Sequence, residues 1–232
     1  MIGRLVLLPG MDGTGELFTG FLKALPLGLE SIIIRFPGDI SMSGSELALF
    51  LKSRIPTTEP FVLLAESFST PLAIQFAATN PPNLRGLILS TGFAKSPVPN
   101  WLGACLPFFA PVLFRIRMPQ SLAERFLLNT RISHNVLHDL RTAVASVRLA
   151  VLTSRLRFIL DCDARNELEQ ITIPILYVQA TEDRLVSNHS GEEIKRINPN
   201  VTVIALNGSH LLLQCMPHQS AEVVSDFIQR ID

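Results

Sequence analysis

Residues 61–70, together with Pro71, constrain the fold more than any other part of this chain. The segment begins with a continuous apolar run, which is typical of a strand buried on both faces of a parallel sheet. Pro71 and the apolar residues after it predict a helix that starts at once, because proline suits the first helical turn. Ser67 therefore lies in a sharp strand-to-helix turn.

A serine in such a turn has two interpretations. One is a nucleophile elbow, written G-x-S-x-G, in which the tight turn requires small residues two positions before and after the serine. Here those residues are Ala65 and Ser69 rather than glycine. An elbow exposes the hydroxyl and directs the next backbone N–H, that of Phe68, towards the oxygen of a bound carbonyl. The other interpretation, a buried strand that ends in a helix N-cap serine, explains this stretch equally well.

The rest of the chain alternates between strand and helix patterns. Strands are predicted at residues 4–8, 31–36, 61–65, 86–90, 173–180 and 201–206, and helices at residues 17–25, 46–55, 71–79, 187–197 and 221–231. Because no hairpin signal separates successive strands, the pattern predicts an α/β fold with a parallel six-stranded sheet and helices on both faces.

Residues 94–169 interrupt this alternation, because they carry no convincing strand pattern. Residues 101–114 are apolar and broken by prolines, whereas residues 120–128 and 134–159 have helical spacing. We therefore expect a core formed by residues 1–93 and 170–232, with a helical insertion between its two parts.

Composition excludes several classes of function. The chain has 232 residues, 47% of them hydrophobic, and a formal net charge of zero, so a nucleic-acid partner is not expected. Cys105, Cys162 and Cys215 lack metal or redox spacing and indicate buried or free thiols in a reducing compartment. The N-terminus lacks a secretory pattern, and the apolar run at 101–116 is too short and too broken to span a membrane. These features predict a cytoplasmic protein without stable membrane insertion.

Polar residues follow several predicted strands at their carboxyl ends, where ligands of open parallel sheets bind. A glycine-rich loop, residues 9–15, follows the first strand, and Ser67 follows the third. Asp183 follows the fifth strand and His210 follows the last. A serine, an acid and a histidine thus occur in that order at separate strand ends, which favours the nucleophile interpretation of Ser67.

The chemistry assigns a role to each of these residues. The Ser67 hydroxyl is a weak nucleophile, and His210 would take its proton during attack and return it to the leaving group. Asp183 would fix the imidazole tautomer and stabilise the imidazolium. The backbone N–H groups of Phe68 and Met11 would form the oxyanion hole.

Over nearly its whole length the chain resembles the α/β-hydrolase superfamily, specifically its serine esterase and lipase-like members. The matching segments are residues 8–15 as the oxyanion loop, 65–69 as the elbow, 180–183 as the acid loop and 208–210 as the histidine loop. Pro9 replaces the usual histidine before the first glycine, and both elbow glycines are replaced. The chain begins at what would be the family's third strand, so the resemblance implies a minimal member, with residues 94–169 as a cap over the site.

Other polar residues near these motifs have less specific interpretations. Glu182 is the nearest rival to Asp183, and Asp183 could also cap the helix that follows it. Asp12 next to a glycine indicates a turn, and Glu66 a supporting hydrogen bond. Four further histidines lack a strand-end context and are expected at the surface or in packing: His134, His138, His189 and His218.

The resemblance implies a carboxylic ester hydrolase that forms an acyl-enzyme. Gly10 in the oxyanion loop and the cap residues Trp101, Phe108 and Phe109 are candidate substrate-binding residues, although the aromatic segment is equally explained as cap core. Its apolar character favours small to medium hydrophobic acyl groups. No metal or organic cofactor is implied, because neither ligand spacing nor a phosphate loop is present.

Three alternatives stay open at this point. An acyltransferase or a thioesterase would use the same residues, and a non-catalytic binding protein could share the fold. The oligomeric state is also undetermined, although the apolar cap is compatible with a dimer.

Overall fold

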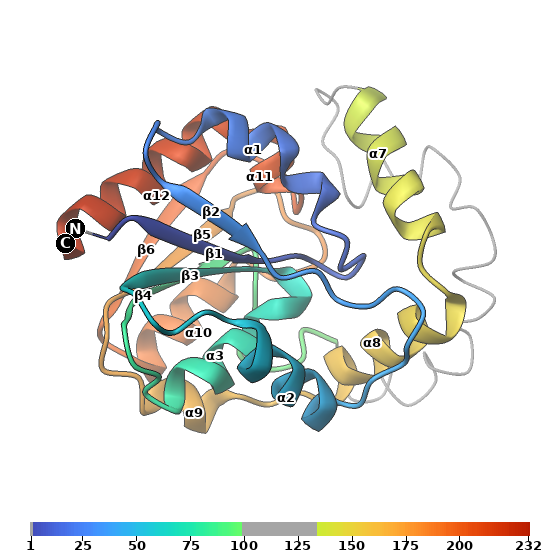
Figure 1. Ribbon diagram of the computed structural model, residues 1–232, viewed down its shortest axis with the longest axis horizontal. Coiled ribbons are helices and arrows are strands. Elements are labelled where there is room, and N and C mark those ends of the chain that lie inside the picture. Colours follow the sequence, from blue (N-terminus) through green and yellow to red (C-terminus); the bar gives the residue numbers. More distant parts are fainter. Residues whose placement is uncertain (1, 99–133) are drawn as a thin grey trace.

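A computed structural model describes residues 2–98 and 134–232 (Figure 1). Its sheet consists of the strands β1 (Arg4–Leu8), β2 (Glu30–Ile33), β3 (Phe61–Glu66), β4 (Leu84–Ser90), β5 (Ile175–Ala180) and β6 (Val201–Leu206). The six strands lie in the order β2-β1-β3-β4-β5-β6, and every adjacent pair is parallel. The predicted parallel six-stranded sheet is therefore confirmed.

Helices cover both faces of the sheet (Figure 1). They are η1 (Glu16–Phe18), α1 (Thr19–Ala24), α2 (Gly44–Arg54), η2 (Ser67–Ser69), α3 (Thr70–Ala78), α7 (His134–Ala145), α8 (Leu149–Asp161), α9 (Arg165–Glu169), α10 (His189–Ile197), α11 (Leu212–Cys215) and α12 (Pro217–Ile231). Within the described ranges, no helix has the length and apolar character needed to cross a membrane.

Two hydrophobic clusters, one on each face of the sheet, form the core. Strand β1 shows how the sequence builds both, because Leu5 and Leu7 belong to one cluster and Val6 and Leu8 to the other. The first cluster packs the sheet against α1, α11 and α12, and the second packs it against α2, α3, α9 and α10. Burial on both faces explains why the strands appear in the sequence as continuous apolar runs.

The order of the strands places the functional loops side by side. Connection β1 to β2 runs towards one edge of the sheet, whereas β3 to β6 lie in sequence on the other side of β1. The order in which strands are added to the sheet therefore reverses between β1 and β3. Open α/β sheets bind their ligands at such a switch point. Leu8 pairs with Ala65 in this register, so the oxyanion loop and the Ser67 turn leave the sheet next to each other.

Strand β2 ends three residues before the predicted boundary at residue 36. The apolar pattern continues through Ile34 and Phe36, which are buried. The N–H of Ile34 still donates to Leu7 of β1, but the hydrogen-bond partner changes at Phe36. The N–H of Phe36 donates to the carbonyl of Gly13 in the oxyanion loop at 2.9 Å. Burial pattern alone cannot separate a strand from an extended segment that braces a loop.

The helical pattern over residues 134–159 becomes two helices rather than one continuous element. The break lies between α7 and α8, where Arg148 has an extended backbone conformation. Its N–H donates to the carbonyl of Gly38 at 2.8 Å, which holds the turn on the loop before α2. Helices α7 and α8 lie beyond one end of the sheet (Figure 1), whereas α9 packs against α3 and α10. The predicted helix at 120–128 lies outside the described residues.

Candidate active site

Ser67 occupies the junction between β3 and the short helix η2. Its backbone φ is 49°, in the left-handed region that residues with a Cβ rarely adopt. Such strain persists only where the surroundings fix the conformation, and it is common at functional sites. Pro71 lies in the first turn of α3, as the sequence predicts. The local geometry is thus that of an elbow that lifts the serine hydroxyl away from the sheet.

The residue that replaces the second elbow glycine takes part in a contact that a glycine could not make. The Ser69 hydroxyl donates a hydrogen bond to the carbonyl of Pro9 in the oxyanion loop, and Ser69 is fully buried. Ala65, at the first glycine position, is also fully buried. Both small residues therefore fit the tight turn, and Ser69 also ties the turn to the neighbouring loop.

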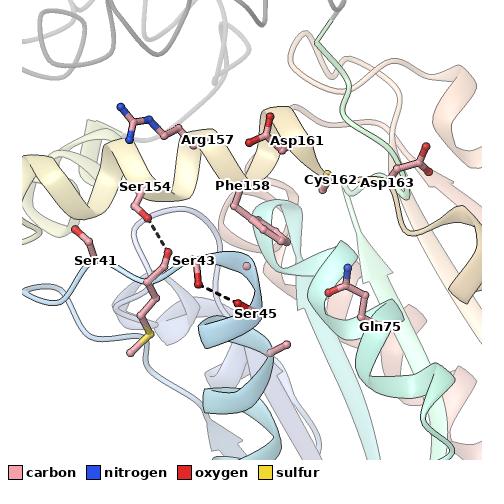
Figure 2. A pocket seen from close by; sticks show the side chains of 13 residues that line it. Ser41, Ser43, Ser45, Gln75, Ser154, Arg157, Phe158, Asp161, Cys162 and Asp163 are labelled. Carbon is pink, nitrogen blue, oxygen red and sulfur yellow. Dashed lines mark hydrogen bonds between the residues drawn. The ribbon is translucent and has the colours of Figure 1, made fainter.

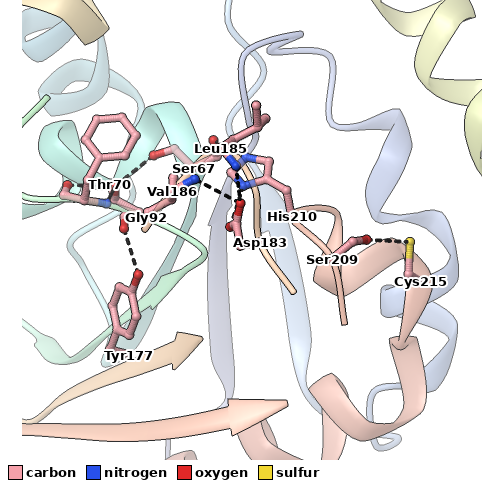
Figure 3. Close-up of polar contacts among 11 residues, drawn as sticks. Ser67, Thr70, Gly92, Tyr177, Asp183, Leu185, Val186, Ser209, His210 and Cys215 are labelled. Atoms are coloured by element: carbon pink, nitrogen blue, oxygen red, sulfur yellow. Dashed lines mark hydrogen bonds and ion pairs between the residues drawn. The ribbon is translucent and has the colours of Figure 1, made fainter. Parts of the chain in front are cut away.

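Thr70 fixes the other side of the elbow. Its hydroxyl lies 2.8 Å from the carbonyl of Ser67 and 3.1 Å from that of Phe93, and it accepts a hydrogen bond from the Phe93 N–H at 3.0 Å. Gly92 must be a glycine here, because a Cβ would lie 2.2 Å from the Thr70 side chain. The Tyr177 hydroxyl donates to the Gly92 carbonyl at 2.8 Å (Figure 3). The segment after β4 thus holds Thr70, and through Thr70 the Ser67 turn, in place.

The structure brings the three predicted side chains together in one hydrogen-bonded chain (Figure 3). Ser67 Oγ lies 2.8 Å from His210 Nε2, and His210 Nδ1 lies 2.8 Å from Asp183 Oδ2. The side chains of His210 and Asp183 are only 8% and 3% exposed. A serine hydroxyl, an imidazole and a buried carboxylate in this order are the arrangement that activates a serine nucleophile.

Asp183 and His210 meet because the pairing of β5 with β6 continues into their loops. The N–H of Glu182 donates to the carbonyl of Gly208 at 2.9 Å, just before each catalytic candidate. Asp183 also braces its own loop, since its Oδ1 accepts hydrogen bonds from the N–H groups of Leu185 (2.8 Å) and Val186 (2.9 Å). Asp183 does not cap the helix that follows, because α10 begins at His189 with Asn188 as its N-cap. One carboxylate oxygen braces the loop before that helix, and the other contacts His210.

The rival candidates lie away from this chain of contacts. The Glu182 side chain is exposed, unlike that of Asp183. His138, His189 and His218 are exposed, as expected, and His189 lies 3.4 Å from Glu192 rather than near Ser67. The side chain of His134 lies outside the described residues.

The two proposed oxyanion donors flank Ser67. Phe68 is the second residue of η2, so its N–H is among those without an intrahelical partner. Met11 lies in the turn that the N–H of Gly13 closes on the carbonyl of Gly10 at 3.0 Å. Within the described residues, neither the Met11 N–H nor the Phe68 N–H has a hydrogen-bond partner. Both are therefore available to a bound oxygen atom.

Comparisons with known proteins show the family of this chain. The profile of the family described as "Serine aminopeptidase, S33" matches residues 45–211, which is more than half of the chain. The chain belongs to this family of α/β-hydrolases. The matched range begins in α2 and includes Ser67, Asp183 and His210.

Individual relatives of this α/β-hydrolase are distant in sequence. It is 22% identical over 216 residues to a proline iminopeptidase from Saccharolobus solfataricus, covering 78% of this chain but 66% of that protein. Among solved structures, an enol-lactonase from Burkholderia xenovorans LB400 has a TM-score of 0.83 at 16% identity, covering 99% of this chain and 92% of that chain. A thermophilic esterase from Thermogutta terrifontis has a TM-score of 0.80 at 16% identity, covering 98% and 90%. At these identities, the structural neighbours establish the fold.

Glu66, the residue before the candidate nucleophile, links three loops of the α/β-hydrolase site. Its Oε1 accepts a hydrogen bond from Gln214 Nε2, in α11, at 3.0 Å. Its Oε2 lies on the other side against Gly10, where an added Cβ would be 3.5 Å away. Burial raises the pKa of Glu66 from 4.5 to about 7. The charge of Asp12 also raises this pKa. The hydrogen bonds from Gln214 and from the Gly10 N–H, and the charge of His210, lower it. The predicted supporting hydrogen bond is present, with Gln214 as the partner that the sequence did not indicate.

This pKa predicts that Glu66 makes the folded state less stable as the pH rises. The folded protein binds the Glu66 proton more tightly than the unfolded chain, so the stabilisation is complete below pH 4.5 and is lost as the pH rises through about 7. A shift from 4.5 to about 7 corresponds to about 3 kcal/mol. Relative to wild type, Glu66→Gln should therefore become more stable by up to this amount between pH 4 and pH 8. Urea unfolding at several pH values measures this difference, with Glu182→Gln as the exposed control; a pH-independent difference would contradict the titration of Glu66.

Other predicted or possible sites lie elsewhere or outside the described part. Trp101, Phe108 and Phe109 lie outside the described residues, so their role as substrate contacts stays a prediction. An open hollow of about 750 Å³ lies between residues 41–45 and α8 (Figure 2), and none of the three hydrogen-bonded side chains lines it. Within the described residues, no group of three or more His, Cys, Asp or Glu side chains could hold a metal ion.

Proposed function

We propose that this α/β-hydrolase cleaves carboxylic esters through an acyl-enzyme on Ser67. The observation that carries the proposal is the hydrogen-bonded chain from Ser67 through His210 to Asp183. His210 Nε2 accepts the hydroxyl proton as Ser67 Oγ attacks the ester carbonyl, and Asp183 holds the opposite ring nitrogen and stabilises the imidazolium. The N–H groups of Met11 and Phe68 stabilise the tetrahedral oxyanion. His210 then donates the proton to the leaving alcohol, and water, activated by His210, releases the acid.

The cap supplies the substrate preference in this proposal. Leu137 of α7 is buried against Leu211, the residue after His210, so the described part of the cap reaches the active-site loops through an apolar contact. Together with the aromatic residues Trp101, Phe108 and Phe109, this supports a small to medium hydrophobic acyl group. Residues 94–169 would form this cap on a core of residues 1–93 and 170–232.

Amide hydrolysis is a second candidate, which the family description and the proline iminopeptidase relative favour. The same acyl-enzyme chemistry serves both bonds, and the difference lies in how a free amino terminus is recognised. Initial rates on p-nitrophenyl esters of increasing chain length and on prolyl p-nitroanilide separate the two. Product analysis with competing alcohols tests the acyltransferase alternative.

The test of the mechanism is a fluorophosphonate probe, because it reacts with serines that a neighbouring base activates. We expect intact mass to show one adduct per chain, peptide mapping to place it on Ser67, and His210→Ala to abolish it. A folded protein without any adduct would contradict the proposal and favour a non-catalytic binding protein. An adduct on another serine would remove Ser67 from the mechanism.

A further inference from the structure

Arg155, in the cap helix α8, is buried although arginine usually lies at the surface. Only 2% of the residue is exposed. Its Nη1 donates hydrogen bonds to the carbonyls of Met11 (2.8 Å) and Asp12 (2.7 Å), and its Nη2 to that of Pro37 (3.0 Å). Two of these three acceptors belong to the oxyanion loop. A cap residue therefore has its polar contacts with the core rather than with solvent.

These contacts act on the turn that presents the Met11 N–H. The peptide group between Gly10 and Met11 is planar, so the Met11 N–H points opposite to the Gly10 carbonyl, which accepts the Gly13 N–H. The next two carbonyls, of Met11 and Asp12, both point to Arg155. With all three carbonyls held, the orientation of the Met11 N–H is determined. Without the guanidinium, the carbonyls of Met11 and Asp12 would lose this donor, and the turn would keep only the Gly13–Gly10 hydrogen bond to orient the Met11 N–H.

Arg155 also contacts the other proposed donor residue. Its guanidinium carbon lies 5.9 Å from the centre of the Phe68 ring and 5.7 Å from that of Phe36. Phe158, one turn further along α8, packs edge-on against the Phe68 ring with centroids 5.5 Å apart. Two side chains of one cap helix thus fix the position of Phe68, whose N–H is the second oxyanion donor.

Helix α8 is itself anchored next to this contact. The Ser154 hydroxyl donates to the carbonyl of Met42 at 2.6 Å across the hollow between α8 and the loop before α2 (Figure 2). The oxyanion loop is shaped to receive Arg155, because Gly13 has a φ of 70° and a Cβ there would lie 2.5 Å from Arg155 Nη1. The absence of a side chain at Gly13 therefore leaves the space that the Arg155 guanidinium occupies.

We propose that Arg155 is a positioning residue for the oxyanion hole, through which the cap helix α8 holds the N–H groups of Met11 and Phe68 in their working orientation. The proposal rests on the proposed function, since it concerns the stabilisation of an oxyanion. Arg155 does not contact the substrate in this arrangement; its effect passes through the two donors. Correct seating of the cap then becomes a condition for catalysis.

The charge of Arg155 is maintained at this buried position. Burial lowers the pKa of Arg155 to about 10, and the charge of Asp12 acts in the opposite direction. The guanidinium therefore stays protonated at neutral pH and can donate to all three carbonyls. Lysine could not replace this contact, because its ammonium group lacks the planar fork that spans several acceptors.

The test compares Arg155→Ala and Arg155→Lys with Arg157→Ala, a matched change on the exposed side of the same helix. Removing one oxyanion donor typically costs about 10²–10³ in kcat, so we expect Arg155→Ala to lower kcat on p-nitrophenyl butyrate by about 10²-fold. KM should stay near the wild-type value, because the lost interaction acts in the transition state. Arg155→Lys should lower kcat by about tenfold, and Arg157→Ala should leave both constants unchanged.

A low concentration of guanidinium chloride, below the onset of unfolding, provides a second measurement. We expect it to restore part of kcat in Arg155→Ala and to leave Arg157→Ala unaffected. A folded Arg155→Ala with wild-type kcat, or a raised KM at unchanged kcat, would overturn the proposal. If Arg155→Ala does not fold, Arg155→Lys decides, and wild-type kcat in that variant would overturn it equally.

The fluorophosphonate probe separates this inference from the proposed function. A wild-type protein that does not react contradicts the proposed function and the inference with it. If the wild-type protein reacts, and the Arg155 variants react at the same rate and keep their kcat, only the positioning role of Arg155 is contradicted. Slower reaction of the folded Arg155 variants supports both.

Discussion

Replacing Ser67 by alanine should lower ester hydrolysis by at least about 10⁴-fold, because no acyl-enzyme can form without the hydroxyl. The substitution keeps the Cβ, and so leaves the backbone strain at the φ of 49° unchanged. It also leaves the contact between His210 and Asp183 in place. We therefore expect a normally folded protein whose remaining rate comes from the oxyanion hole and from binding alone.

The measurement is kcat/KM on p-nitrophenyl butyrate for variants purified away from any host esterase. Ser53→Ala is the matched control, since Ser53 is exposed on α2 and its hydroxyl donates to the carbonyl of Phe50 in the same helix. Circular dichroism and thermal unfolding establish that both variants fold. Activity of Ser67→Ala within tenfold of wild type would show that a different residue carries the reaction.

The sequence allowed prediction of the sheet and of the loops at its strand ends, because both depend on local patterns. Continuous apolar runs identify strands buried on both faces, and the residues after them must lie at one edge of a parallel sheet. Ser67, Asp183 and His210 were found in this way, and the structure places them in hydrogen-bond contact. Their catalytic roles stay a proposal until the variants are tested.

The residues that sequence reasoning missed act through contacts between distant segments. Arg155 lies in an amphipathic helix, where a basic residue ordinarily indicates a solvent-facing position, and its partners Met11 and Asp12 are more than a hundred residues away. Ser69 counted as a departure from the elbow glycine, but its hydroxyl gains a bond to Pro9 that glycine lacks. Only the three-dimensional arrangement reveals either partner.

The limits of β2 show a different reason for incomplete prediction. Ile34 and Phe36 are buried like strand residues, so the apolar pattern extends past Ile33. The N–H of Ile34 still donates to Leu7 of β1, whereas that of Phe36 donates to Gly13 in the oxyanion loop, a choice that depends on hydrogen-bond geometry rather than on hydropathy. Hydropathy therefore determines which residues are buried but leaves the ends of elements undetermined.

Asp183→Asn should lower kcat/KM by about 10⁴-fold while leaving the fold intact, because it inverts the tautomer of His210. Asp183 Oδ1 accepts the N–H groups of Leu185 and Val186, and only the amide oxygen of asparagine can take over both bonds. The amide NH₂ must then occupy the position of Oδ2 and donate to His210 Nδ1, which becomes the acceptor. Neutral His210 would carry its proton on Nε2, and could no longer accept the proton of Ser67.

Three variants make this argument testable in one kinetic series. Asp183→Asn should retain wild-type thermal stability at neutral pH and lose activity, since the loop keeps its acceptor for the N–H groups of Leu185 and Val186. Asp183→Ala should lose both stability and activity. Its free energy of unfolding should fall by about 1–3 kcal/mol, because the N–H groups of Leu185 and Val186 lose their acceptor. Glu182→Gln, with an exposed side chain, should change neither. Activity of Asp183→Asn within tenfold of wild type would show that Asp183 does not orient His210. Loss of activity in Glu182→Gln would assign that role to Glu182 instead.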